Sequence, residues 1–248
     1  MSSGKYDLVI GNGCSFTEGG GLNNPRIYKF LTNKDMENDD GEIFMKENSY
    51  PKFLGDKFNC DYKNISESCS SNNFIIERAY QELQKHNDKR VLIINQLSMP
   101  TRLGFKNKNK YYSYNGMAGK LTHTVKDGNY TDHKFIDGLL ENFDKFYKHY
   151  ILDTFDINYH WEVISMQMDL FNSWCEKRNI DNYWVSWDEY DRIAHIERVI
   201  DCDGACINTW ALENRYRLQD IPLIPHKDSH LSIEGHKQIA NIIYEKIR

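Results

Sequence analysis

The feature that most constrains the fold is a pair of short apolar runs that contain no polar residue. Leu8-Val9-Ile10 ends at the turn signal Gly11-Asn12-Gly13, and Val91-Leu92-Ile93-Ile94 lies further along the chain. Apolar runs of this length are typical of strands that are buried on both faces of a parallel sheet. Because such a sheet needs a layer of helices on each face, the two runs favour an α/β domain.

Other strand and helix patterns alternate along the chain. We expect strands over about 6–10, 61–65, 91–94 and 182–187, and helices over about 51–58, 73–85, 135–177 (in two or more pieces) and 233–247. Residues 192–200 remain ambiguous. Alternation of this kind predicts a parallel sheet wrapped by helices, in one domain that spans residues 1–248.

Two polar insertions interrupt the alternation, at about 18–48 and 103–140. The first is rich in Gly, Asn and Asp, and residues 103–134 are rich in Lys, Asn, Gly and Tyr with little periodicity. We interpret residues 103–134 as an extended loop or a small insertion. The two segments account for a mean hydropathy of −0.70, and we expect them to form the rim of a binding site.

Charge and composition exclude several classes of protein. The chain has 31 Lys and Arg against 36 Asp and Glu, a net charge of −5, which argues against a nucleic-acid partner. It has no apolar stretch of about 18 residues and no signal-peptide pattern, so we expect no membrane partner and synthesis in a cytoplasm. Release by lysis and association with a virion stay open. We expect the six cysteines to be mostly reduced.

Polar segments follow the predicted strands where a parallel sheet binds ligands, at its carboxyl edge. They are residues 11–18, 69–72 and 95–102, and residues 226–236 precede the last helix. Ser15, flanked by glycines, has the access that a nucleophile needs, although a helix-capping serine would look the same. His230 could take its proton, because Asp228 at i−2 leans to the same side. A surface loop of capping residues is the alternative for that segment.

Together these segments resemble the SGNH hydrolase superfamily, whose members are also called GDSL esterases and lipases. The resemblance includes phage and bacterial members of unassigned role. Gly13-Cys14-Ser15-Phe16-Thr17 resembles the first block, with Cys14 where Asp is usual, and Asp228-Ser229-His230-Leu231-Ser232 resembles the last. Residues 64–72 and 93–102 resemble the second and third blocks. The resemblance runs in order from residue 5 to 247.

The resemblance implies a three-layer α/β/α, flavodoxin-like sandwich with a mainly parallel five-stranded sheet. It also implies ester hydrolysis through an acyl-enzyme, with no metal and no organic cofactor. Ser15 is then the nucleophile and oxyanion donor, His230 the base and Asp228 the orienting acid. Because the family's Asp usually lies three residues before the His, where this chain has Lys227, a backbone carbonyl could hold His230 instead.

The middle blocks differ from the family's pattern. Cys69 or Ser70 aligns with the oxyanion glycine of the second block, beside Asn72. The asparagine of the third block is replaced: Ser98 lies near its place, and the other candidate donors are Asn95, Gln96 and Arg102. Loss of one oxyanion donor typically costs about 10²–10³ in rate.

We therefore expect a serine hydrolase acting on a small-molecule or polysaccharide ester, such as an O-acetyl group on a carbohydrate. The alternatives are a non-catalytic module that binds a glycan or a partner, for example a phage structural or accessory protein, and an acyl transferase. We also considered a Cys14 thiolate nucleophile, zinc at Cys202 and Cys206, and a sugar or nucleic-acid platform at 106–114. The sequence favours none of these three.

Overall fold

The computed structural model of the chain describes residues 4–107, 110–115, 120–124, 156–222 and 228–248. A five-stranded sheet is formed by β1 (Leu8–Asn12), β2 (Asp61–Asn64), β3 (Val91–Leu97), β7 (Asp181–Ser186) and β8 (Val199–Ile200). The strand order is β2-β1-β3-β7-β8, and every pairing is parallel. This is the order of flavodoxin-like folds, so the predicted fold class is confirmed.

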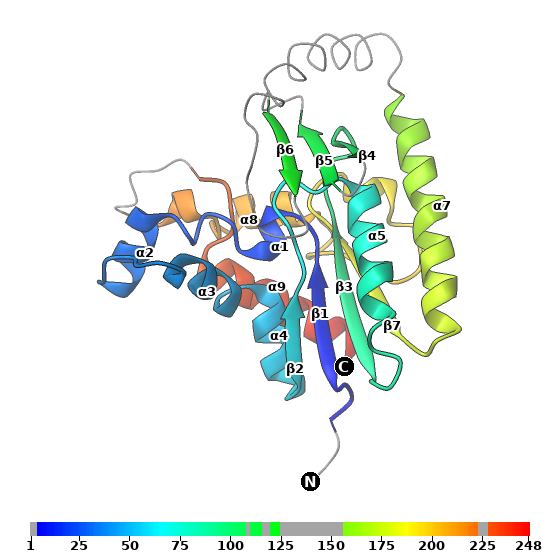
Figure 1. Cartoon of the computed structure of the whole chain (residues 1–248), viewed down its shortest axis with the longest axis horizontal. Helices are drawn as coiled ribbons and strands as arrows, with labels where there is room; N and C mark the ends of the chain where they lie inside the picture. Colours follow the sequence, from blue (N-terminus) through cyan, green and yellow to red (C-terminus); the bar gives the residue numbers. More distant parts are fainter. Residues whose placement is uncertain (1–3, 108–109, 116–119, 125–155, 223–227) are drawn as a thin grey trace.

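Helices cover both faces of this sheet (Figure 1). One layer contains α4 (Tyr50–Phe58) and α9 (Ile233–Ile247), and the other contains α5 (Asn72–Leu83) and α7 (Ile157–Glu176). Neighbouring residues of a strand enter opposite cores: Val9 packs in the α4 and α9 layer, and Leu8 packs in the α5 and α7 layer. Burial on both faces is the physical reason for the unbroken apolar runs.

The carboxyl ends of β1 and β3 mark the place where the strand order reverses. From β1 the chain passes outward to β2, and it then crosses over to β3 on the other side. Loops that leave neighbouring strands in opposite directions open a crevice at such a switch point. The short helix α1 (Ser15–Glu18) begins at this edge.

The two polar insertions have regular structure. The first contains α2 (Pro25–Thr32) and α3 (Asp40–Glu47), packed around a small cluster that includes Leu22, Ile27 and Met45. Residues 103–134 were expected to be an extended loop or a small insertion, and their described part forms the antiparallel strands β4 (Leu103–Asn107), β5 (Lys110–Asn115) and β6 (Lys120–Thr124). Tyr and Thr favour strands, and this outweighs the weak periodicity. Residues 125–140 lie outside the described ones.

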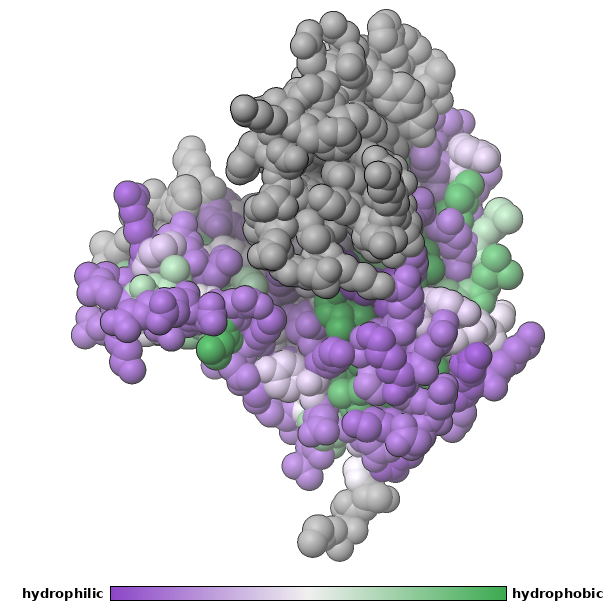
Figure 2. Space-filling view, viewed as in Figure 1, coloured by the Kyte–Doolittle hydropathy of each residue, from purple (hydrophilic) through white to green (hydrophobic). Residues whose placement is uncertain are grey.

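Figure 1 shows this second sheet beyond the carboxyl ends of the main strands. The remaining elements are the 3-10 helices η2 (Tyr190–Arg192) and η3 (Leu218–Asp220) and the helix α8 (Ile207–Glu213). The face in Figure 2 is mostly hydrophilic, with apolar residues along the edge formed by α7, whose exposed apolar side chains include Met166 and Leu170. Within the described residues, no helix is both long and apolar enough to span a bilayer.

Candidate active site

Ser15 lies at the first position of α1, directly after the turn that ends β1. Cys14 caps this helix with extended backbone, so the Ser15 N–H is in the first turn, where no intrahelical acceptor exists. Ser15 is 9% exposed. Its neighbour Cys14 is fully buried, and the thiol accepts a hydrogen bond from the Gln96 amide at 3.4 Å. The chain therefore turns the hydroxyl toward the His230 imidazole and the thiol into the core.

His230 links Ser15 to a carboxylate. Its Nε2 lies 2.9 Å from Ser15 Oγ, and its Nδ1 lies 2.6 Å from Asp228 Oδ1. The same Asp228 oxygen accepts the His230 backbone N–H at 2.9 Å, as in an Asx turn. This local turn lets a carboxylate two residues before the histidine reach its ring. Of the two ways to hold the imidazole, the geometry therefore selects Asp228 over a backbone carbonyl.

The segment that carries His230 is anchored along its length. The Leu218 N–H donates to His230 O at 2.8 Å, and the Ser232 N–H donates to Tyr216 O at 2.7 Å. Ser232 then caps α9 by accepting the Gly235 N–H at 3.1 Å. The histidine is thus fixed between a bridge to the η3 region and the start of a long helix.

Aromatic rings and glycines surround the imidazole. Phe16 stacks on Trp187 with 3.2 Å between ring centroids, and it lies 4.6 Å from the His230 ring. A Cβ at Gly20 would lie 3.0 Å from His230 Nε2, and one at Gly21 would lie 2.7 Å from Asp228 Oδ2. Gly21 also has a φ of 84°. The sequence analysis missed these glycines, although the Gly19-Gly20-Gly21 run was a visible signal of close approach.

The Glu67–Ser70 turn supplies the second-block residues. The Ser70 N–H bonds to Glu67 O at 3.3 Å, and Cys69 has a φ of 62°, in the left-handed region that glycine favours. The turn therefore holds a cysteine in a conformation that glycine adopts more easily. Of the Cys69 and Ser70 N–H groups, that of Cys69 has no acceptor among the described residues, because the Ser70 N–H is used within the turn.

The third-block candidates divide into engaged and unengaged groups. Gln96 accepts a hydrogen bond from Thr17 Oγ1 at 2.6 Å, and Asn72 clamps both the N–H and the carbonyl of Ser98 at 2.7 and 3.1 Å. Within the described part of the chain, Ser98 Oγ and the Nε and Nη1 atoms of Arg102 are buried without a hydrogen-bond partner. The unengaged donors are therefore Ser98 and Arg102.

Asn95 belongs to a buried chain of amides, the asparagine ladder (Asn12, Asn95, Asn182 and Asn172). Asn12 Nδ2 donates to Asn95 Oδ1 at 2.6 Å, and Asn95 Nδ2 donates to Asn182 Oδ1 at 2.7 Å. Asn182 Nδ2 then donates to Asn172 Oδ1 at 2.6 Å. Asn95 therefore uses its amide to join strands, which removes it from the set of free oxyanion donors.

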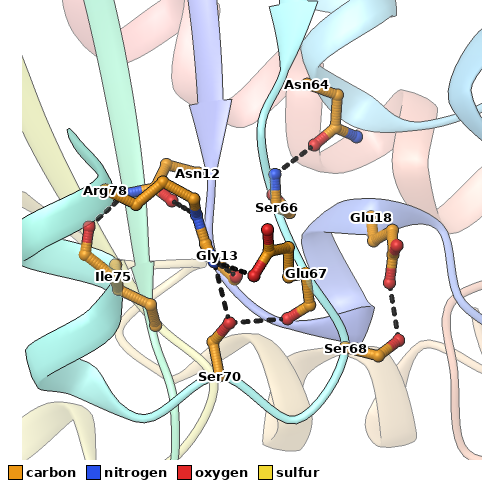
Figure 3. A network of polar contacts seen from close by, with 10 residues as sticks. All are labelled: Asn12, Gly13, Glu18, Asn64, Ser66, Glu67, Ser68, Ser70, Ile75 and Arg78. Atoms are coloured by element: carbon orange, nitrogen blue, oxygen red, sulfur yellow. Dashed lines mark hydrogen bonds and ion pairs between the residues drawn. The ribbon is translucent and has the colours of Figure 1, made fainter. Parts of the chain in front are cut away.

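Arg78 of α5 contacts both the asparagine ladder and the Glu67–Ser70 turn. Its guanidinium donates to Asn12 Oδ1 at 2.9 Å, to Gly13 O at 2.7 Å, to Glu67 Oε2 at 2.9 Å and to Ser70 Oγ at 3.1 Å. Figure 3 shows Arg78 between β1 and the Glu67–Ser70 turn. No motif pointed to this residue in the sequence.

An acidic side chain stands on the far side of the same turn. Glu18 accepts the Ser68 hydroxyl at 2.6 Å (Figure 3). Burial raises the pKa of Glu18, and the nearby Glu67 carboxylate raises it further. The hydrogen bond from Ser68 opposes this shift.

Other chemistry considered from the sequence finds little support. All six cysteines are free, and Cys206 caps α8 with its sulfur. The described residues contain no cluster of three or more His, Cys, Asp or Glu that could hold a metal ion. The platform at 106–114 includes residues 108–109, which lie outside the described part.

Comparison with known proteins finds no matching family model and no matching curated protein. Solved structures do match. They include a putative lipolytic protein of the G-D-S-L family from Desulfitobacterium hafniense DCB-2 (12% identity, TM-score 0.42, 96% of this chain and 98% of that one), the psychrotrophic esterase EstA from Pseudoalteromonas sp. (12%, 0.44, 97% and 96%) and a carbohydrate esterase (11%, 0.43, 100% and 70%). The first is described as a G-D-S-L family protein, and the other two are described as esterases. At such low identity, residue roles in this chain rest on its own geometry.

Proposed function

We propose that the chain is a serine ester hydrolase that forms an acyl-enzyme on Ser15. The observation that carries the proposal is the unbroken hydrogen-bonded path from Ser15 Oγ through the His230 ring to Asp228, with steps of 2.9 and 2.6 Å. A nucleophile, a base and an orienting group in this order are the requirements of acyl transfer.

In the first half-reaction, Ser15 Oγ attacks the carbonyl carbon of the ester and gives its proton to His230 Nε2. Asp228 stabilises the imidazolium that forms. The tetrahedral intermediate then expels the alcohol, which takes the proton from Nε2, and the acyl group stays on Ser15. In the second half-reaction, water attacks the acyl-enzyme by the same proton path and releases the carboxylic acid.

The oxyanion of each tetrahedral intermediate needs hydrogen-bond donors. We assign this role to the backbone N–H groups of Ser15 and Cys69. Both belong to turns that leave these groups without an acceptor among the described residues. Ser98 and Arg102 are the side chains that stand in for the family's third-block asparagine.

The substrate class in this proposal is an ester of a carbohydrate, such as an O-acetyl group. Its support is the β4-β5-β6 sheet, which extends beyond the carboxyl ends of the main strands and is Tyr-rich in sequence (Figure 1). An extended sheet at the carboxyl edge of the main sheet suits a polymeric substrate. Release of acetate from acetylated polysaccharides, compared with that from short acyl esters of p-nitrophenol, tests this class.

Covalent labelling tests the reaction itself. A fluorophosphonate probe should label the wild-type chain, and Ser15→Ala should abolish the label. His230→Ala should slow labelling by several orders of magnitude, because the serine then lacks its base. A wild-type chain that labels no faster than Ser15→Ala would refute the proposal.

A second candidate is a binding module that keeps the fold without efficient chemistry. Two observations favour it: Asn95 has its amide engaged in the asparagine ladder, and Cys69 occupies the position of the family's glycine. This candidate predicts glycan or partner binding that is equal in the wild type and in Ser15→Ala, together with no turnover of any ester.

A further inference from the structure

Arg78 makes four hydrogen bonds that converge on two parts of the site. Two of its acceptors, Asn12 Oδ1 and Gly13 O, belong to the end of β1 and the turn that leads to Ser15. The other two, Glu67 Oε2 and Ser70 Oγ, belong to the Glu67–Ser70 turn. Figure 3 shows the guanidinium reaching both groups from α5. One planar guanidinium therefore contacts both segments to which we assign the backbone oxyanion donors.

A direct contact between the two segments accompanies the arginine. The Glu67 N–H donates to Gly13 O at 3.2 Å, so this carbonyl accepts from both the turn and the guanidinium. A planar fork with fixed donor directions defines the relative position of its acceptors more tightly than an ammonium group can. The side chain of Arg78 is only 17% exposed, which protects these bonds from competition by water.

We propose that Arg78 is a positioning residue for the reaction assigned to this site. It holds the Glu67–Ser70 turn, and with it the Cys69 N–H, at a fixed distance from the Ser15 nucleophile. The inference rests on the proposed hydrolase function. It adds a residue that touches neither the nucleophile nor its base and that acts through backbone placement.

Positioning of this kind has a kinetic signature. Displacement of an oxyanion donor by about 1 Å weakens the transition state more than the bound ester, and it typically costs up to about 10²-fold in rate. For Arg78→Lys we therefore expect kcat to fall about 10- to 100-fold with a p-nitrophenyl acetate substrate. KM should stay within about threefold, because the ground-state ester does not use the oxyanion donors fully.

Arg90→Lys is the matched control. Arg90 also bonds two ways to one partner, with Nη2 and Nε at 2.6 and 3.1 Å from Asp7, but it lies at the opposite end of β1 and β3. Arg90→Lys removes a guanidinium that makes two hydrogen bonds to one carboxylate, far from the nucleophile. Arg90→Lys should therefore keep the wild-type kcat.

Chemical rescue separates positioning from a general loss of structure. A cavity of about 400 Å³ lies beside Arg78, lined in part by Phe74, Ile65 and Glu18. In Arg78→Ala, added methylguanidine can reach the vacated place through this cavity. We expect it to raise kcat in a saturable way, with no gain in Arg78→Lys or Ser15→Ala.

Hydrogen exchange tests the positioning role of Arg78 independently of the proposed hydrolase function. Arg78→Lys should speed amide exchange in residues 66–72 and 13–15 and leave α9 unchanged, whether or not the wild type hydrolyses esters. If the wild type is inert toward esters and fluorophosphonate, the hydrolase proposal fails by itself. If Arg78→Lys is folded and has wild-type kcat, or wild-type exchange in these segments, the positioning role is wrong.

Discussion

At the scale of single residues, Cys69 has a left-handed backbone conformation that glycine usually adopts. Its φ of 62° costs an ordinary L residue roughly 1–2 kcal/mol relative to right-handed backbone. Glycine escapes this cost but loses about 0.5–1 kcal/mol through its freedom in the unfolded chain. The balance favours glycine by a small margin.

We therefore predict that Cys69→Gly raises the free energy of unfolding by up to about 1 kcal/mol and keeps or raises kcat. Cys69→Val, whose β-branched side chain tolerates left-handed backbone poorly, should lower stability by more than about 1 kcal/mol. Denaturant unfolding of the two variants measures the difference. Equal stabilities would mean that this turn does not hold the left-handed conformation.

His236 carries a pH-dependent part of the stability. It is fully buried, its Nδ1 accepts the Tyr50 N–H at 3.3 Å, and its Nε2 has no partner among the described residues. Burial lowers the pKa of His236 to about 3, and the nearby His230 adds to this shift. As the pH falls, His236 takes up a proton near pH 6.5 in the unfolded chain but only near pH 3 in the folded chain.

Stability from this group is therefore complete above about pH 6.5 and falls as the pH drops toward 3, by up to about 1.4 kcal/mol per pH unit. His236→Asn keeps an acceptor for the Tyr50 N–H but cannot titrate. We predict a shallower loss of unfolding free energy between pH 6 and pH 4 in this variant. Parallel curves for variant and wild type in denaturant titrations would contradict the assignment.

At the scale of elements, the glycine run after α1 presses backbone against the groups that hold His230. Gly21 and Gly204 both have left-handed φ, 84° and 80°. A Cβ at Gly21 would lie 2.6 Å from Leu218 Cδ1 and 2.7 Å from Asp228 Oδ2, whereas a Cβ at Gly204 would meet nothing within 4 Å. The pair thus separates backbone strain from steric displacement of Asp228 and Leu218.

Gly21→Ala should lower kcat about 10- to 100-fold by moving Asp228 away from the imidazole. Gly204→Ala should lose a similar amount of stability to backbone strain, about 1 kcal/mol, and keep its kcat. Steady-state kinetics and thermal unfolding of the two variants provide the comparison. Equal activity in both would show that Asp228 tolerates the displacement.

Sequence reasoning succeeded where one period or one turn decides the structure. It predicted the last helix over 233–247, observed as Ile233–Ile247, and the apolar core of β3. It placed the first strand two residues early, because it read Gly11-Asn12 as a turn although both residues still pair in the sheet. It left an extended loop or a small insertion open for β4, β5 and β6, since short antiparallel strands depend on partners that a local window does not contain.

The candidate site was predictable in part for the same reason. Ser15, His230 and Asp228 lie in local blocks with characteristic neighbours. The engagement of Asn95 and Gln96, and the bonds of Arg78 to Asn12 and Gly13, depend on contacts between residues more than 60 positions apart. Such contacts leave no local pattern, so only the folded chain reveals which polar groups are free.

At the scale of the whole molecule, the asparagine ladder joins β1, β3, β7 and α7 across the sheet. Asn182 stands at its middle, where it accepts from Asn95 and donates to Asn172. Replacement by alanine leaves the buried donor Asn95 Nδ2 without its acceptor, whereas Asn172 Oδ1 keeps the Trp184 Nε1–H donor at 2.8 Å. A buried group left unpaired typically costs about 1–3 kcal/mol.

Asn182→Ala should therefore lower the free energy of unfolding by roughly 1–3 kcal/mol. Asn241→Ala, which removes an amide that bonds only to Gln238 on the surface of α9, should change it by less than about 0.5 kcal/mol. Urea unfolding followed by circular dichroism measures both. A cost for Asn182→Ala as small as that of the control would mean that water can replace the ladder.

The ladder also has a direction. Arg78 can only donate to Asn12, so Asn95 and Asn182 each have the amide oxygen toward β1 and the amide nitrogen toward α7. Only one alignment of the strands satisfies that order. A slip of one residue would turn Asn95 to the other face of β3, and a slip of two would set Ile93 or Leu97 against Asn12. The hydrogen bonds of the ladder therefore stabilise the native strand register relative to shifted registers.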